Sequence, residues 1–174
     1  MDAVSDIFAA VGNFLDSGGP VLKVILIVSV CLWCLITERL LYFKLNYPAQ
    51  QQLWLAQWQA RPDKSSTHAH YIRTSIISDA KLAMGKTLPI IKMLIALCPL
   101  LGLLGTVTGM IHVFDVMAIT GTGNARAMAS GISLATIPTM AGMVIAIAGL
   151  YFSKVIEERV SDETHHLADL LKYQ

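Results

Sequence analysis

Three long stretches of this chain contain no Asp, Glu, Lys or Arg, and they limit the possible folds more than any other feature. They cover residues 24–37, 93–111 and 127–153, which are 14, 19 and 27 residues long. A helix needs about 20 apolar residues to cross the hydrocarbon core of a bilayer. The first stretch is short, but the charged residues at its two ends can reach toward the headgroups. The pattern therefore predicts three transmembrane helices.

The low charge content excludes several classes of protein. Charged residues make up 14% of the 174 residues and hydrophobic residues 55%, whereas an ordinary soluble domain is about one quarter charged. This balance argues against a soluble enzyme, a disordered segment and a nucleic-acid binder. A very apolar soluble helical bundle is the remaining alternative to a membrane protein.

The positions of Lys and Arg predict the orientation of the spans. Residues 1–22 contain neither, residues 38–92 contain eight, residues 112–126 contain one, and residues 154–174 contain three. Basic loops remain in the cytoplasm, so we expect the N-terminus outside and the C-terminus inside. Because the first 22 residues also contain three acids, we expect no removable signal peptide there.

Helical periodicity continues outside the three spans and divides the chain into seven segments. The apolar stripes of the cytoplasmic segments are too long for one small chain to cover, which favours bundling with other copies. The expected segments are an N-terminal amphipathic interfacial helix (1–18), the first transmembrane helix (20–43), a cytoplasmic helical region (44–90), the second transmembrane helix (91–114), a periplasmic loop (115–126), the third transmembrane helix (127–153) and a cytoplasmic helical tail (154–174).

Cysteine and histidine give no sign of a metal or redox centre. Cys31 and Cys34 have the spacing of a redox pair, but they lie in an expected span. The two histidine pairs, at 68 and 70 and at 165 and 166, lack the i, i+4 spacing of a helical metal site. We therefore expect no metal, no cofactor and no catalytic residues.

Small residues and prolines recur within the second and third spans. Residues of this size at intervals of three or four let two helix backbones approach closely, either within the chain or between neighbouring subunits. Each proline lacks a backbone N–H, and we expect a kink there. The packing candidates are Gly102, Gly105, Gly109, Gly131, Ala135 and Gly142, and the kink candidates are Pro99 and Pro138.

Hydroxyl groups in the third span form a locally polar zone. Ser130, Ser133, Thr136 and Thr139 recur every three residues. They can bond back to their own helix at little cost, or they can face a cavity or partner helix. No carboxylate, Lys, Arg or His lies deep within any expected span. If the protein takes part in ion movement, the titrating group must come from another chain.

Two segments resemble known motifs. Residues 98–110 (CPLLGLLGTVTGM) and 131–142 (GISLATIPTMAG) resemble the second-helix and third-helix motifs of the ExbB, TolQ and MotA proton-channel family. Three spans and a large first loop are most similar to a short ExbB of a TonB energy-transducing system. The resemblance implies an all-α membrane protein with long cytoplasmic helical extensions, assembled as a homopentameric ring in the bacterial inner membrane with its N-terminus in the periplasm.

The resemblance also implies partners and site residues. An ExbD-like dimer inside the pore would supply a protonatable Asp, and a TonB-like protein would carry the work to outer-membrane transport. Membrane lipid is the third expected partner, and no nucleic acid is expected. Thr106 and Thr139 match the family threonines that line the proton path, and helix geometry adds Thr136 and Ser133.

Departures from the family motif leave other functions open. The common third-helix motif has Glu where this chain has Leu134 and a later Pro where it has Ala148, while Pro138 is extra. A Glu-dependent step therefore cannot be transferred, and the path would depend on hydroxyls, water and the partner's carboxylate. The alternatives are a TolQ-like role in envelope integrity or division, a motility stator, and a passive scaffold or independent small transporter.

Overall fold

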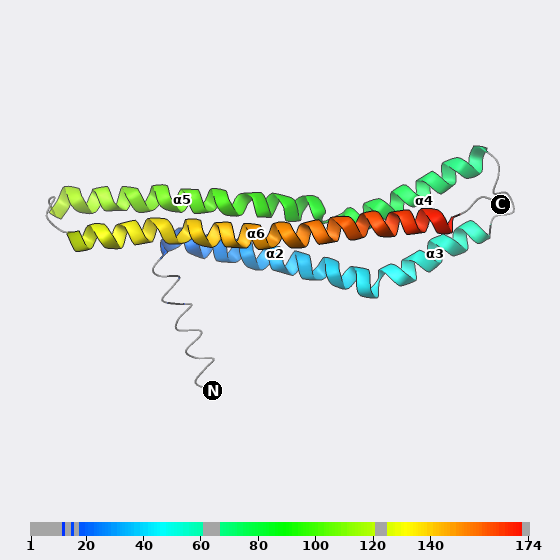
Figure 1. Cartoon of the computed structure of the whole chain (residues 1–174), viewed down its shortest axis with the longest axis horizontal. Coiled ribbons are helices and arrows are strands. Elements are labelled where there is room, and N and C mark those ends of the chain that lie inside the picture. The colour runs from blue at the N-terminus through cyan, green and yellow to red at the C-terminus, as the bar shows by residue number, and fades with distance from the viewer. Residues whose placement is uncertain (1–11, 13–14, 16–17, 61–66, 121–124, 172–174) are drawn as a thin grey trace, which may run out of the picture. The chain divides into compact units, whose positions relative to one another are not determined.

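The computed structural model describes residues 12, 15, 18–60, 67–120 and 125–171 (Figure 1). The amphipathic helix expected at 1–18 lies almost entirely outside these residues. The described elements are all helices, and they are α2 (Gly19–Leu45), α3 (Tyr47–Gln59), α4 (Thr67–Gly85), α5 (Leu88–Thr120) and α6 (Ala125–Leu170).

Three of the helical segments are long and apolar enough, by length and composition, to cross a membrane. They contain the charge-free stretches of α2, α5 and α6. The prediction of an all-helical membrane protein with three spans is confirmed at this level, and the chain is a multi-pass membrane protein.

Proline and glycine mark the places where helices begin and end. Gly19 has a φ of 68°, a conformation that favours glycine, and Pro20 follows it in the first turn of α2. Pro48 likewise occupies the first turn of α3, so the chain resumes its helix at Tyr47, just before the proline. α4 ends at Gly85, and α5 starts at Leu88.

Helix occupies more of the chain than the sequence prediction allowed. α5 continues to Thr120 and α6 begins at Ala125, so both extend into the expected loop at 115–126. α6 then runs without interruption to Leu170 and includes Pro138. Where the bilayer begins and ends along these helices stays a prediction.

The chain divides into two compact units. Unit 1 contains Met1–Trp33 and Met93–Leu150, and unit 2 contains Cys34–Lys92 and Tyr151–Gln174. In unit 1, α5 (green) and the first part of α6 (yellow) lie side by side in Figure 1. Their contact consists largely of small residues, which lets the two backbones meet.

Four glycines, Gly102, Gly105, Gly109 and Gly142, lie where α5 and α6 touch in unit 1. We call this helix–helix contact the glycine seam. A Cβ added at Gly102 would lie 2.9 Å from Cα of Thr139, and one at Gly105 would lie 2.5 Å from Cβ of Pro138. Added Cβ atoms at Gly109 and Gly142 would meet Cα of Ala135 at 2.6 Å and the carbonyl oxygen of Cys98 at 2.5 Å. Residue numbers therefore increase along α5 as they decrease along the contacting face of α6, so the two helices are antiparallel.

Arg39 holds the junction between α4 and α5 in unit 2. Its side chain is only 3% exposed. Its Nε donates to Oγ1 of Thr87 at 2.7 Å, and its Nη1 donates to the carbonyl of Ala83 at 3.2 Å. The guanidinium also lies 4.9 Å from the ring centre of Tyr42, within range of a cation–π interaction. Arg39 thus caps the last turn of α4 from α2.

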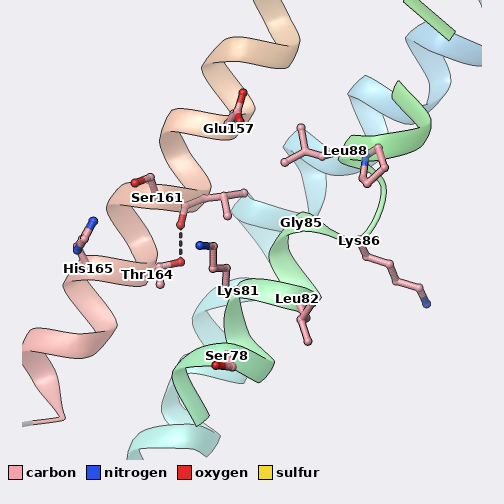
Figure 2. Close-up of a pocket in the computed structure, with 13 residues that line it drawn as sticks. Ser78, Lys81, Leu82, Gly85, Lys86, Leu88, Glu157, Ser161, Thr164 and His165 are labelled. Carbon is pink, nitrogen blue, oxygen red and sulfur yellow. Dashed lines mark hydrogen bonds between the residues drawn. The ribbon is translucent and has the colours of Figure 1, made fainter. Parts of the chain in front are cut away.

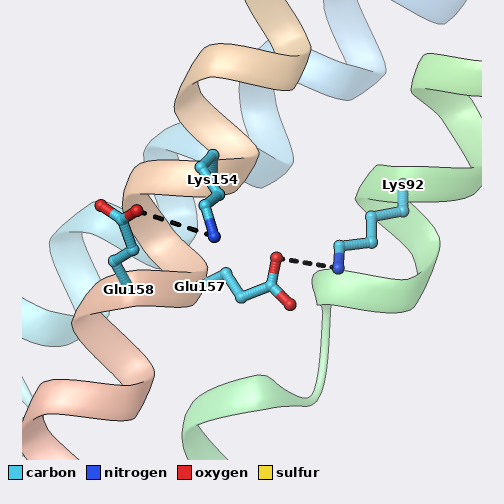
Figure 3. Close-up of polar contacts among 4 residues, drawn as sticks. All are labelled: Lys92, Lys154, Glu157 and Glu158. Carbon is cyan, nitrogen blue, oxygen red and sulfur yellow. Dashed lines mark hydrogen bonds and ion pairs between the residues drawn. The ribbon is translucent and has the colours of Figure 1, made fainter.

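Two ion pairs join charged side chains on the surface of unit 2 (Figure 3). Nζ of Lys92 on α5 lies 3.0 Å from Oε2 of Glu157 on α6, while Lys154 and Glu158 pair along α6 at 3.6 Å. The hydrogen bond from Lys92 and its positive charge hold the pKa of Glu157 below its usual range. Both pairs are solvent-exposed, so they add little to stability.

Arg73 caps the end of α6 in the same way that Arg39 caps α4. Its Nη2 donates to the carbonyl of Ala168 at 2.7 Å and its Nε to that of Leu171 at 2.8 Å. We expect Arg73→Gln to leave these terminal carbonyls without the charged donor and to fray the last turn. Amide hydrogen exchange at residues 167–171 should become about tenfold faster, corresponding to about 1.4 kcal/mol. Arg159→Gln, at an exposed position of α6, is the control, and equal exchange in both variants would contradict the capping role.

Candidate functional site

The hydroxyl zone predicted from the sequence lies on the α5–α6 pair of unit 1, beside the glycine seam. Thr139 is half-buried, and its Oγ1 donates across the seam to the carbonyl of Gly102 at 2.8 Å. This is a bond between two helices and not a bond back to its own turn. The two positions lie together because Gly102 lacks the Cβ that would separate the backbones.

The other candidate threonines bond within their own helices. Oγ1 of the half-buried Thr106 donates to the carbonyl of Leu103 at 2.7 Å. Oγ1 of the exposed Thr136 is within reach of two carbonyls, those of Ile132 at 3.2 Å and Ser133 at 3.3 Å. A threonine hydroxyl has one proton to donate and two lone pairs. All three threonines therefore commit their proton to this chain and keep only acceptor capacity.

Ser133 differs from the three threonines. Its side chain is exposed, and its hydroxyl has no hydrogen-bond partner among the residues that the structure describes. It can donate as well as accept. Ser133 and Thr136 are three residues apart and so lie near one another on α6. The side chains of Ser130 and Leu134 lie outside the described residues.

The two prolines occupy different surroundings. Pro138 is fully buried and packs against Gly105, where an added Cβ would meet its ring. Pro99 is half-buried in α5. Neither has the N–H that would satisfy the carbonyl four residues earlier. The polar character of the zone thus includes backbone acceptors as well as hydroxyls.

A small cavity near the start of α2 was not expected from the sequence. It has a volume of about 310 Å³, and its lining includes Gly18, Thr108, Gly109 and His112. Thr108 donates to the carbonyls of Leu104 and Gly105, so it repeats the pattern of the other threonines. Periodicity gave no signal for this cavity, because it depends on where α2 packs against α5.

Ionisable groups are sparse in the part of unit 1 that the structure describes. Between residues 93 and 111 of α5, and from 131 to 150 of α6, the sequence has no Asp, Glu, Lys, Arg or His. Among the described residues, no group of three or more His, Cys, Asp or Glu side chains comes together to hold a metal ion. Within these two ranges the zone therefore contains hydroxyl groups and backbone carbonyls but no carboxylate, amine, guanidinium or imidazole side chain.

Arg39 is a structurally important polar residue whose role the sequence did not indicate. It lies just after a charge-free stretch, where nothing in the sequence points to its partners. The structure buries it against Ala83 and Thr87. Tyr47 is a second buried polar group of unit 2, and burial raises its pKa well above the usual range, with Glu163 adding to the effect.

Comparison with known proteins agrees with this architecture. Residues 47–169 match the model of the MotA/TolQ/ExbB proton channel family. The chain is 37% identical over 128 residues to biopolymer transport protein ExbB-like 1 of Synechocystis sp., and 44% identical over 64 residues to ExbB-like 3 of the same organism. It is 34% identical over 80 residues to the ExbB homolog of Methanothermobacter thermautotrophicus.

These alignments cover only part of each relative. They span 72%, 36% and 46% of this chain, but 44%, 30% and 28% of the three relatives. The chain thus matches less than half the length of each. The family match, in contrast, takes in α3, α4, α5 and nearly all of α6. The chain therefore belongs to the MotA/TolQ/ExbB proton channel family.

Proposed function

We propose that this chain is the wall subunit of an ExbB-like proton channel in a bacterial inner membrane. Five copies surround an ExbD-like dimer, and the assembly uses the proton-motive force to energise TonB-dependent outer-membrane transport. The N-terminus is periplasmic and the C-terminus cytoplasmic, as the distribution of Lys and Arg predicts. Family membership and the names of the relatives as biopolymer transport proteins support this proposal.

One observation carries the proposal, and it is the bonding of the three threonine hydroxyls. Each donates its proton to a carbonyl of this chain, so each can only accept a hydrogen bond from a ligand. A protonated carboxyl group can donate one, whereas a carboxylate cannot. Thr106, Thr136 and Thr139 therefore favour the neutral form of a partner's Asp over the charged form.

Ser133 gives the proposed path a second kind of contact. Its hydroxyl keeps a proton to donate, so it can also bond to a carboxylate. Beside Ser133 the charged form of a partner Asp can accept a hydrogen bond, which favours release of its proton. Beside the threonines only the neutral form can form a hydrogen bond, which favours uptake of a proton. The four residues form the proposed proton path, and the glycine seam keeps Thr139 and Gly102 in place.

Removal of the Thr139 hydroxyl tests the proposal. We expect Thr139→Val to lower proton flux about tenfold in liposomes that contain the chain and its ExbD-like partner, because one acceptor for the neutral carboxyl is lost. Thr106→Val should also lower the proton flux. Thr139→Ser, which keeps a hydroxyl group, should retain most of the wild-type flux. Flux is measured with a pH-sensitive dye inside the liposomes.

Thr74→Val is the matched control. Thr74 is exposed on α4, outside the expected spans, and donates to the carbonyl of His70 at 3.0 Å, so the variant loses a hydroxyl that bonds within its own helix, as Thr136 does. Native mass spectrometry should show the same assembly for all variants. Full flux in both Thr139→Val and Thr106→Val would contradict the assigned path. Proton flux by the chain without any partner would contradict the supply of the carboxyl by another chain.

A further inference from the structure

A groove in unit 2 lies between α4, the start of α5 and α6 (Figure 2). Its volume is about 1050 Å³, and its lining includes Lys81, Leu82, Lys86 and Thr164. Figure 2 shows Lys81 extending from α4 toward α6, beside Thr164, while Lys86 extends in the opposite direction, away from α6. Of these two lysines, Lys81 is therefore the one whose amine faces across the groove.

The amine of Lys81 is available for an anionic partner. Lys81 forms no ion pair with any carboxylate that the structure describes. Glu157 is the one carboxylate among the lining residues named for this groove, and Lys92 already pairs with it at 3.0 Å. An acid from outside this chain can therefore pair with Lys81.

An acidic surface lies on a different side of α6. It is a shallow groove of about 360 Å³, lined by Val155, Glu158, Arg159, Asp162 and Glu163. Its three carboxylates outnumber its one guanidinium. Glu158 pairs with Lys154 at 3.6 Å, whereas Asp162 forms no ion pair within the described part of the chain. Asp162 is thus an acid available for a cation from outside this chain.

The two surfaces are separate. No residue named in the lining of one is named in the lining of the other. Consecutive residues on a helix point about 100° apart, so Ser161 faces the first groove while Asp162 faces the acidic surface. One chain can therefore use both surfaces at once, each toward a different neighbour.

An apolar face of α4 lies beside the first groove. Tyr71 and Leu82 are 72% and 71% exposed. They are eleven residues apart in the sequence, which is about three helical turns, so they lie on the same face. Both are outside the expected spans, where lipid does not cover them. Large side chains of this kind are typical of surfaces that a protein partner covers.

We propose that the acidic surface of α6 docks on the Lys81 groove of the next copy of this chain. The carboxylate of Asp162 pairs with the amine of Lys81, and the docked α6 covers Leu82. Because two different surfaces meet, the contact is head-to-tail, and its repetition by rotation closes a ring. This inference rests on the ring of copies proposed above, and it adds which surfaces of adjacent copies meet.

The depths of the two charged groups agree with this contact. Copies in a ring around an axis along the membrane normal are related by rotation alone, so equal residue numbers lie at equal depth. Lys81 extends beside Thr164 of its own chain, and Asp162 is two residues from Thr164, about 3 Å along a helix. Asp162 of the next copy therefore lies at nearly the depth of the Lys81 amine.

Charge reversal tests the pair, with native mass spectrometry of the full chain in detergent over a dilution series. Lys81→Glu places like charges opposite each other, so we expect the protein concentration at half-assembly to rise about tenfold. Asp162→Lys should act similarly, and Lys81→Glu/Asp162→Lys should return to within about threefold of the wild type. Lys86→Glu makes the same charge change on the side chain that points away, and it should shift assembly less than about threefold.

A double variant that fails to recover, or an equal loss in Lys86→Glu, would overturn the proposed pair. Cross-linking tests the contact without relying on charge. Lys81→Cys/Asp162→Cys treated with a short bis-maleimide should give a ladder of covalent multimers in a denaturing gel, because each copy contributes one thiol to each of two contacts. Each single variant keeps Cys31, Cys34 and Cys98 and gives the background.

The outcomes separate this inference from the proposed function. A cross-linked dimer with no higher multimer would show a face-to-face contact and overturn the head-to-tail arrangement. Intact rings in native mass spectrometry without a ladder would overturn the docking surfaces alone and leave the proposed function standing. A wild-type chain that stays monomeric, both alone and with its ExbD-like partner, would overturn both.

Discussion

Gly109→Ala is expected to lower the free energy of unfolding by about 3 kcal/mol, one of the two largest effects we predict. The added methyl group would lie 2.6 Å from Cα, 2.7 Å from Cβ and 2.8 Å from N of Ala135. Two of these three atoms belong to the backbone, so a change of rotamer cannot relieve the clash. The helices must move apart, which weakens the bond from Thr139 to Gly102. Unfolding in mixed detergent micelles, followed by circular dichroism, measures the loss.

Gly85→Ala is the control for this prediction. An added Cβ at Gly85 meets nothing within 4 Å, so the substitution should leave stability unchanged or raise it slightly through higher helix propensity. Ala135→Gly combined with Gly109→Ala should restore only part of the loss, because the backbone atoms of residue 135 remain. Equal stability of Gly109→Ala and the wild type would show that the helices are not in backbone contact at this level.

Arg39→Ala is expected to cost about 3 kcal/mol, for a different reason. The substitution leaves the carbonyl of Ala83 and the hydroxyl of Thr87 without their charged donor, and it opens a cavity beside Tyr42. We expect the junction between α4 and α5 to loosen as well. Hydrogen exchange at residues 83–88 should therefore rise along with the loss measured by unfolding.

Two further variants separate the capping role of Arg39 from a general effect of charge. Lys44→Ala removes a positive charge from an exposed position in the last turn of the same helix and should change stability by less than about 0.5 kcal/mol. Arg39→Lys keeps the charge but loses the planar set of donors, so it should recover only a minor part of the loss. Full recovery with lysine would mean that charge alone matters at this position.

Much of the fold could be predicted from the sequence because hydropathy reports directly on burial in a bilayer. The three charge-free stretches led to α2, α5 and α6, and the Gly and Ala spacing indicated helix faces suited to close contact. The extent of the helices was less predictable. A loop was expected at 115–126, outside the three charge-free stretches, yet residues 115–120 continue α5, because a helix does not need to end where a membrane span ends.

The polar contacts could not be predicted, because they join residues far apart in the sequence. Arg39 and Thr87 are 48 positions apart, and Thr139 and Gly102 are 37 apart. Whether a threonine hydroxyl bonds within its helix or across to another depends on how closely the backbones approach. The spacing of Thr106, Thr136 and Thr139 identifies them as candidates, but it cannot say which carbonyl takes each proton.

The glycine seam also governs how this sequence can drift from one lineage to the next. At residues 109 and 135 every larger side chain is penalised, since each helix occupies the space that its neighbour would need. On the opposite side of α6, Met140, Val144 and Ile147 are each about two-thirds exposed, so apolar exchanges there cost little within one chain. Substitution should therefore be slow on one face and fast on the other, unless a neighbouring subunit restricts the second face as well.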